Sequence, residues 1–160
     1  MRILGIDPGL ERIGFGLLNR QGSQLSAIEL GLLVTPRIEL PLRLADLHHQ
    51  VVELLDRTQP DSVATERLLF TVNKTTAMDV AKALGVVLLE VGRRGIPWCE
   101  YSPPEVKLSV VGNGAAEKKQ VQFMVTKILG LRETPKPDDV ADALAIAICH
   151  AFRAPRVGNG

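Results

Sequence analysis

Residues 2–7 read Arg-Ile-Leu-Gly-Ile-Asp, and the turn dipeptide Pro8-Gly9 follows them directly. Residues 3–6 are apolar or small with no alternation, which is typical of a strand covered on both faces. We therefore predict a central strand that ends at Asp7. Taken alone, Asp7 is more typical of a turn residue bonded to its own backbone than of a metal ligand. Its role depends on whether other acids converge on it.

A second predicted strand also ends in an acid. Residues 62–66 read Ser-Val-Ala-Thr-Glu, and the apolar spacing between residues 42 and 58 predicts a helix before them. A strand, helix, strand order favours two parallel strands joined by a right-handed crossover. Asp7 and Glu66 would then emerge at the same carboxyl edge, where open α/β sheets bind their ligands.

The other patterns complete an α/β domain. Gly14 and Gly16 fall on one face of a strand predicted at residues 13–19, antiparallel to the first, and leave room for a ligand or a closely packed helix. Gly130 is expected to end a helix. The remaining predicted elements are strands at residues 24–34 and 96–101, the latter at an edge, and helices at 75–94, 102–111, 115–129 and 138–149.

The last predicted helix carries an acid pair. Asp139 and Asp142 are three residues apart and therefore share a face, whereas Asp138 is expected to act as the helix cap. Asp142 begins a nearly all-apolar helix, so we expect it to be buried and to need a partner. Lys136 is the one basic residue near it in the sequence, and a divalent cation is the other candidate. Carboxylate ligands suit Mg²⁺ or Mn²⁺, and two such ions can promote phosphodiester hydrolysis.

Two further features suggest a binding surface, but each is weaker evidence than the acid pair is for a metal site. Lys118 and Lys119 follow a glycine loop and fall in the first turn of a predicted helix, which suits phosphate binding, although solvated lysines are the commoner explanation. The loop at residues 67–73 is unexpectedly apolar, as a core plug or a contact surface would be. His48 and His49 are adjacent on a helix and therefore poor joint metal ligands.

Composition sets broad limits. The chain has 160 residues, 46% hydrophobic, so we expect one domain over residues 1–153 and a flexible tail over 154–160. A net charge of +1 argues neither for nor against nucleic-acid binding. Cys99 and Cys149 match no metal or redox spacing, so we predict two buried thiols in a protein of the reducing cytoplasm. No apolar run approaches the length of a membrane span.

Together these motifs resemble the RuvC Holliday junction resolvases of the ribonuclease-H-like superfamily, from Arg2 to about Phe152. The motifs that carry the resemblance are Ile-Leu-Gly-Ile-Asp7-Pro-Gly, Glu66, the stretch Val106-Lys107 through Gly112-x-Gly114 to Lys118, and Asp139-x-x-Asp142-Ala-Leu-Ala-Ile-Ala. The resemblance implies a ribonuclease-H-like fold with a five-stranded mixed sheet and helices on both faces. It further implies a homodimer that nicks two opposed strands of a four-way DNA junction with Mg²⁺, acting beside a branch-migration helicase complex.

The resemblance also implies roles for individual residues. The catalytic metal ligands would be Asp7, Glu66, Asp139 and Asp142, with two Mg²⁺ ions per site and Mn²⁺ as a substitute. The DNA-contacting lysines would be Lys107 and Lys118. Lys119, which follows Lys118 directly, is a further DNA-binding candidate. Family members often carry a base-contacting aromatic three residues after the glutamate. This chain has Leu69 there, followed by Phe70, so that either residue could contact bases, and Asn73 is a further DNA-binding candidate.

Three other functions fit parts of the pattern. A ribonuclease-H-like nuclease acting on ribosomal RNA would be expected to lack the stretch from Lys107 to Lys118. An actin-like sugar kinase also begins with Asp-x-Gly but needs two such domains, more than 160 residues allow. A catalytically silent junction-binding module would not need all four acids. We therefore expect a metal-dependent endodeoxyribonuclease that resolves four-way junctions by paired symmetric nicks, in recombination and repair.

Overall fold

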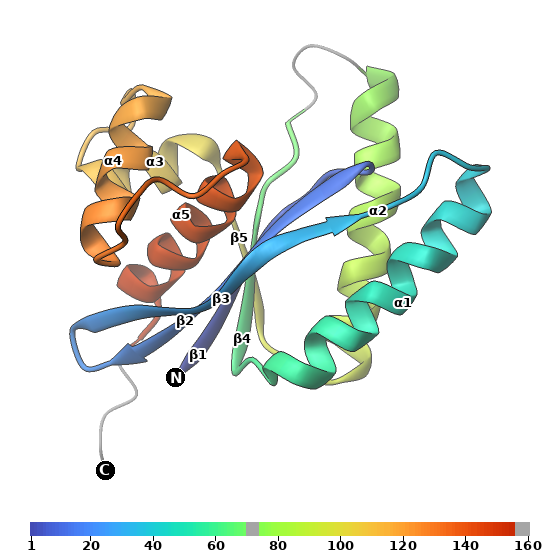
Figure 1. The fold of residues 1–160 in the computed structure, drawn as a ribbon, viewed down its shortest axis with the longest axis horizontal. Helices are drawn as coiled ribbons and strands as arrows, with labels where there is room; N and C mark the ends of the chain where they lie inside the picture. The colour runs from blue at the N-terminus through green and yellow to red at the C-terminus, as the bar shows by residue number, and fades with distance from the viewer. Residues whose placement is uncertain (70–73, 156–160) are drawn as a thin grey trace.

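In the computed structural model, residues 1–69 and 74–155 are described, and they form one five-stranded mixed sheet with helices on both faces (Figure 1). The strand order is β3-β2-β1-β4-β5, so the predicted central strand is central and the fifth strand lies at an edge. The strands are β1 (Arg2–Asp7), β2 (Arg12–Gln21), β3 (Gln24–Val34), β4 (Ser62–Glu66) and β5 (Trp98–Tyr101). β1 pairs antiparallel with β2 and parallel with β4, as the sequence predicted.

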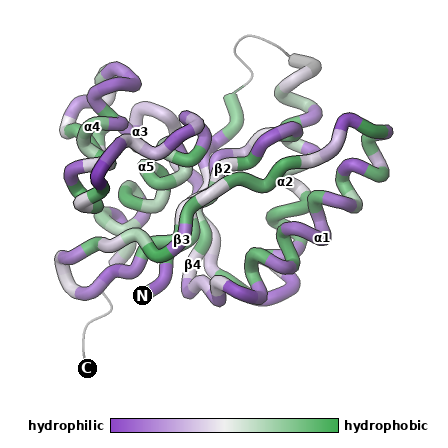
Figure 2. The backbone as a smooth tube through the Cα atoms, in the orientation of Figure 1, coloured by the Kyte–Doolittle hydropathy of each residue, from purple (hydrophilic) through white to green (hydrophobic). Residues whose placement is uncertain are grey.

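The helices divide between the two faces of the sheet. On one side lie α1 (Leu40–Thr58) and α2 (Lys74–Arg93), and on the other lie α3 (Pro103–Val111), α4 (Lys118–Ile128) and α5 (Asp138–Arg153) (Figure 1). Each side has its own hydrophobic core, with β1 supplying residues to both. Figure 2 shows hydrophobic and hydrophilic stretches alternating along α1, as expected of a helix that buries one face.

Glycines let α5 lie very close to the sheet. A Cβ atom added at Gly5 or Gly14 would collide with the backbone of α5, and one added at Gly16 would collide with Leu144. Of the two uses predicted for the glycine face of β2, the packed helix is therefore the one observed. This close approach fixes the start of α5 above the end of β1.

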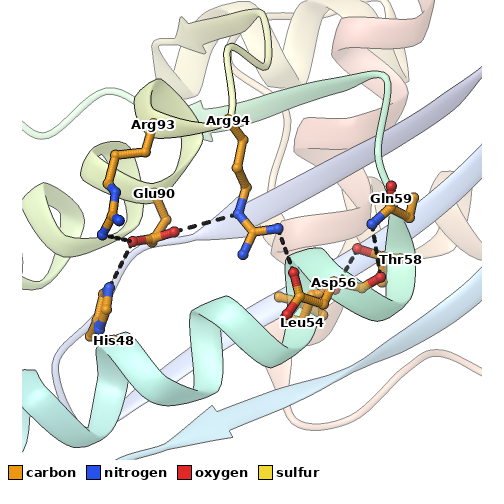
Figure 3. A network of polar contacts seen from close by, with 8 residues as sticks. All are labelled: His48, Leu54, Asp56, Thr58, Gln59, Glu90, Arg93 and Arg94. Carbon is orange, nitrogen blue, oxygen red and sulfur yellow. Dashed lines mark hydrogen bonds and ion pairs between the residues drawn. The ribbon is translucent and has the colours of Figure 1, made fainter.

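A polar network joins α1 to α2 on the opposite face (Figure 3). The carboxylate of Glu90, which is only 4% exposed, lies 2.7 Å from His48 Nε2 and within ion-pair distance of Arg93 and Arg94. Arg94 also reaches Asp56 on α1, at 2.6 Å. His48 thus has an acidic partner on α2.

Three local predictions were wrong. α4 begins at Lys118 rather than at residue 115, because Glu117 and Gln120 form a capping box. Asp138 is not the cap of α5, since Pro137 occupies that position and the Asp138 side chain accepts a hydrogen bond from Gln122 instead. Cys149 is buried as expected, but Cys99 is exposed because it lies on the edge strand β5.

The division into a domain at residues 1–153 and a flexible tail at 154–160 stays a prediction, since residues 156–160 lie outside the described residues. Arg20 donates hydrogen bonds to the carbonyl oxygens of Ala151, Ala154 and Pro155, which fixes the end of α5. Over the described ranges, no helix has the length and apolar character needed to cross a membrane.

Candidate metal centre and DNA-binding surface

Two acids lie at the carboxyl edge of neighbouring parallel strands. Ile6 of β1 is opposite Thr65 of β4 in the parallel register, so the next residues, Asp7 and Glu66, emerge side by side from the sheet. The backbone of the following residue, Arg67, is fixed by donation of its N–H to the Tyr101 carbonyl oxygen at 2.8 Å. Both acids therefore stand on a rigid support.

The N-terminus of α5 brings two further acids to the same edge. Asp7 pairs across the sheet with Gly14 of β2, and Gly14 lies against the backbone of Asp139. Asp142 follows one helical turn later on the same face of α5. The close packing of α5 on glycine is thus what places Asp139 and Asp142 near Asp7.

The electrostatics of these acids reflect their proximity. Burial, followed by the negative charges of Asp142, Glu66 and Asp139, raises the pKa of Asp7 to about 8. Burial also raises the pKa of Glu66 and that of Asp142, and in Glu66 the Asp142 carboxylate adds to the effect. When these acids are ionised together their negative charges repel one another, and a bound cation would relieve that repulsion.

The donor set fits a hard divalent cation. All four predicted ligands offer carboxylate oxygens, the ligand type that Mg²⁺ and Mn²⁺ prefer. In the described part of the chain, Asp139 Oδ2 is the one buried side-chain oxygen or nitrogen that makes no hydrogen bond. An Arg12 nitrogen lies 3.2 Å from that oxygen, close enough for an ion pair but without hydrogen-bond geometry. No three acid, histidine or cysteine side chains among residues 1–69 and 74–155 already enclose a point where an ion could bind.

Lys118 is the basic partner of two of the α5 acids, Asp138 and Asp142. Its Nζ lies 3.1 Å from Asp138 Oδ2 and 3.6 Å from Asp142 Oδ2. Sequence reasoning found only Lys136 near Asp142 and missed this contact, which joins residues 24 positions apart and depends on how α4 packs against α5. Asp142 is only partly buried, with 33% of its side chain exposed, which differs from the prediction, but it does have the expected partner, and a lysine supplies it.

One pocket is lined by two of the four acids and by both predicted DNA-contacting lysines. Ser102 and Glu105 form a capping box that starts α3, and this helix presents Lys107 to the pocket. The lining residues are Glu66, Pro103, Val106, Lys107, Lys118, Val121, Asp142 and Ala145. Lys119 is exposed and lines a different groove, which α4 forms with the segment before α5 and with Asp138.

The predicted base-contacting loop is only partly described. Leu69 is 49% exposed, which is compatible with a contact surface rather than a core plug. Phe70 and Asn73 lie outside the described residues. Sequence reasoning did not single out Arg67, whose Nε lies 3.1 Å from Glu100 Oε1 and which thereby ties the start of this loop to β5.

Comparisons of the sequence and of the structure with known proteins lead to the same family. Residues 3–150 match the family model described as "Crossover junction endodeoxyribonuclease RuvC". A protein of that name from Syntrophomonas wolfei is 50% identical over 151 residues, covering 94% of this chain and 88% of the relative. The RuvC structure from Thermus thermophilus superposes with a TM-score of 0.89 at 38% identity, covering 96% of this chain and 95% of that one. The same protein in complex with a Holliday junction substrate gives a TM-score of 0.90 at 38% identity, with 96% and 94% covered.

Proposed function

The chain belongs to the RuvC family of crossover junction endodeoxyribonucleases, and from this premise we propose that it resolves four-way DNA junctions by paired symmetric nicks. The observation that carries the proposal is the gathering of Asp7, Glu66, Asp139 and Asp142 at one sheet edge, where burial and the negative charges of the other three acids raise the pKa of Asp7. A junction-bound relative with the same fold supports DNA as the substrate.

Nucleases of this family depend on divalent metal ions, and we propose Mg²⁺, with two ions per site and Mn²⁺ as a substitute. Asp7 and Glu66, on the sheet, and Asp139 and Asp142, on α5, are the proposed ligands and catalytic residues. When bound, such ions activate water for attack on a phosphodiester and stabilise the charge on the leaving oxygen. The protein contributes a rigid set of carboxylates, because β1, β4 and α5 are all anchored in the core.

Lysines beside the acids would position the DNA backbone. Lys107 and Lys118 line the same pocket as Glu66 and Asp142, so a phosphate held by these lysines would lie next to the proposed ligands. Lys119 would contact DNA farther out on α4. Beyond the strand end, the loop residues Leu69, Phe70 and Asn73 are proposed to meet bases at the branch point.

Two identical sites are needed to cut two opposed strands, and we propose a homodimer with two-fold symmetry. α2 is the proposed dimer surface, which its exposed apolar residues Met78 and Leu89 support, at 55% and 57% exposure. A branch-migration helicase complex is the proposed functional partner, by analogy with the family. A DNA substrate also accords with the cytoplasmic location expected from the sequence.

Substrate selection tests this function directly. The protein is incubated with Mg²⁺ and one of three labelled substrates: a synthetic four-way junction, a linear DNA duplex of the same sequence, and a structured ribosomal RNA fragment. We expect nicks in opposed strands of the junction and little cleavage of the other two. Preferential RNA cleavage would favour the RNA-processing alternative, and tight junction binding without nicks would favour the silent binding module.

A further inference from the structure

We propose that Lys118 is an internal counter-ion of the α5 acids that competes with divalent metal for Asp142, so that metal binding releases the lysine toward a DNA phosphate. The competition between ammonium and metal concerns the protein alone. The delivery of the lysine to DNA rests on the function proposed above.

The position of Lys118 is held by the acids rather than by its own helix. Lys118 is the first residue of α4, where the positive end of the helix dipole disfavours a cation. Its Nζ nevertheless lies 3.1 Å from Asp138 and 3.6 Å from Asp142, across the interface between α4 and α5. Gln122, one turn farther along α4, donates a hydrogen bond to the other oxygen of Asp138 at 3.2 Å. The two helix starts are therefore joined by a defined set of polar contacts.

A divalent cation would disturb this arrangement at Asp142. The oxygen of Asp142 that faces Lys118 belongs to a proposed metal ligand, whereas Asp138 is 62% exposed and is not one. A doubly charged ion on Asp142 would repel the ammonium group at short range. Lys118 is 55% exposed, so its side chain can leave without disrupting the core.

The pocket is the place where the released Lys118 would contact a DNA phosphate. Lys107 and Lys118 both line it, together with the two acids Glu66 and Asp142. An ammonium group that is paired with Asp142 cannot at the same time make its full contact with a phosphate. Metal occupancy and phosphate contact thus favour the same position of Lys118, which couples the assembly of the metal centre to DNA binding.

Metal titration without DNA tests the competition. Mn²⁺ binding is measured by calorimetry for the wild type, Lys118→Gln and the matched control Lys119→Gln, which removes the same charge from the next residue. Because exposed ion pairs contribute up to about 1 kcal/mol, we expect Lys118→Gln to bind Mn²⁺ up to about fivefold more tightly than the wild type. Lys119→Gln should stay within about twofold of the wild type, because Lys119 lines a different groove.

A spectroscopic readout follows the lysine itself. The Lys118 side-chain resonance, assigned by its loss in Lys118→Gln, should shift on addition of Mg²⁺ toward the value of a solvated lysine. Equal Mn²⁺ affinities for the two glutamine variants, or a Lys118 resonance that Mg²⁺ leaves unchanged, would overturn the counter-ion proposal alone. A wild-type protein that binds no Mn²⁺ would instead contradict the metal centre of the proposed function.

Discussion

The substitution Asp7→Asn should make the protein more stable while it abolishes nicking. Asp7 has a pKa of about 8 in the folded protein, against an ordinary value of 3.8. At pH 7 the folded state therefore keeps a proton that the unfolded state releases. The ordinary pKa of an aspartate lies about three units below pH 7, and each unit corresponds to about 1.4 kcal/mol. The proton that the folded state keeps at pH 7 therefore destabilises it by at most about 4 kcal/mol.

The sign of the pH dependence follows from the raised pKa. Below about pH 4 both states are protonated and the penalty vanishes, and it grows as pH rises toward 8. Asparagine carries no charge at any of these values. The stability advantage of Asp7→Asn over the wild type should therefore increase steadily between pH 4 and pH 8.

Urea denaturation in chelator, at several pH values in that range, measures the effect. The exposed Glu133, in the loop before α5, provides the control Glu133→Gln, whose stability should track the wild type. Addition of Mg²⁺ should stabilise the wild type more than Asp7→Asn, because a ligand that binds the folded state raises its stability. An Asp7→Asn curve that runs parallel to the wild type across the pH range would refute the electrostatic reasoning.

Other perturbations probe separate parts of the account. Lys107→Ala or Lys118→Ala should weaken junction binding and reduce the slope of log affinity against log salt by about one, measured by fluorescence anisotropy; unchanged slopes would exclude phosphate contacts. Mn²⁺ affinity should rise between pH 6 and pH 8, because protons compete for Asp7, and a flat calorimetric profile would contradict this. Gly14→Ala should lower the free energy of unfolding by about 2 kcal/mol or more, because its Cβ would meet the α5 backbone, whereas Gly114→Ala, whose Cβ would make only ordinary contacts with Pro104, should be near neutral in the same urea assay.

Local patterns were enough to predict most of the fold. The unbroken apolar run before Asp7 predicted a buried central strand, and the strand, helix, strand order predicted the parallel neighbour that ends at Glu66. A short-range signal also predicted the helix stop at Gly130. These features depend on residues a few positions apart, which a sequence displays directly.

Contacts between residues far apart in the sequence could not be predicted in the same way. The ion pair of Lys118 with Asp142 depends on the packing of α4 against α5, which no local spacing encodes. The start of α4 was misplaced because a glutamate cap is an uncommon signal. The exposure of Cys99 followed from the edge position of β5, where the small size and apolar character of the residue misled the prediction.

We propose that the four carboxylates form a metal centre for junction cleavage. Nicking of a synthetic four-way junction, by the wild type and by Asp7→Asn, in Mg²⁺ and in chelator, tests it most directly. We predict paired nicks in opposed strands for the wild type in Mg²⁺ alone, with junction binding retained by Asp7→Asn. Nicking by Asp7→Asn in Mg²⁺ at the wild-type rate, or by the wild type in chelator, would contradict the claim.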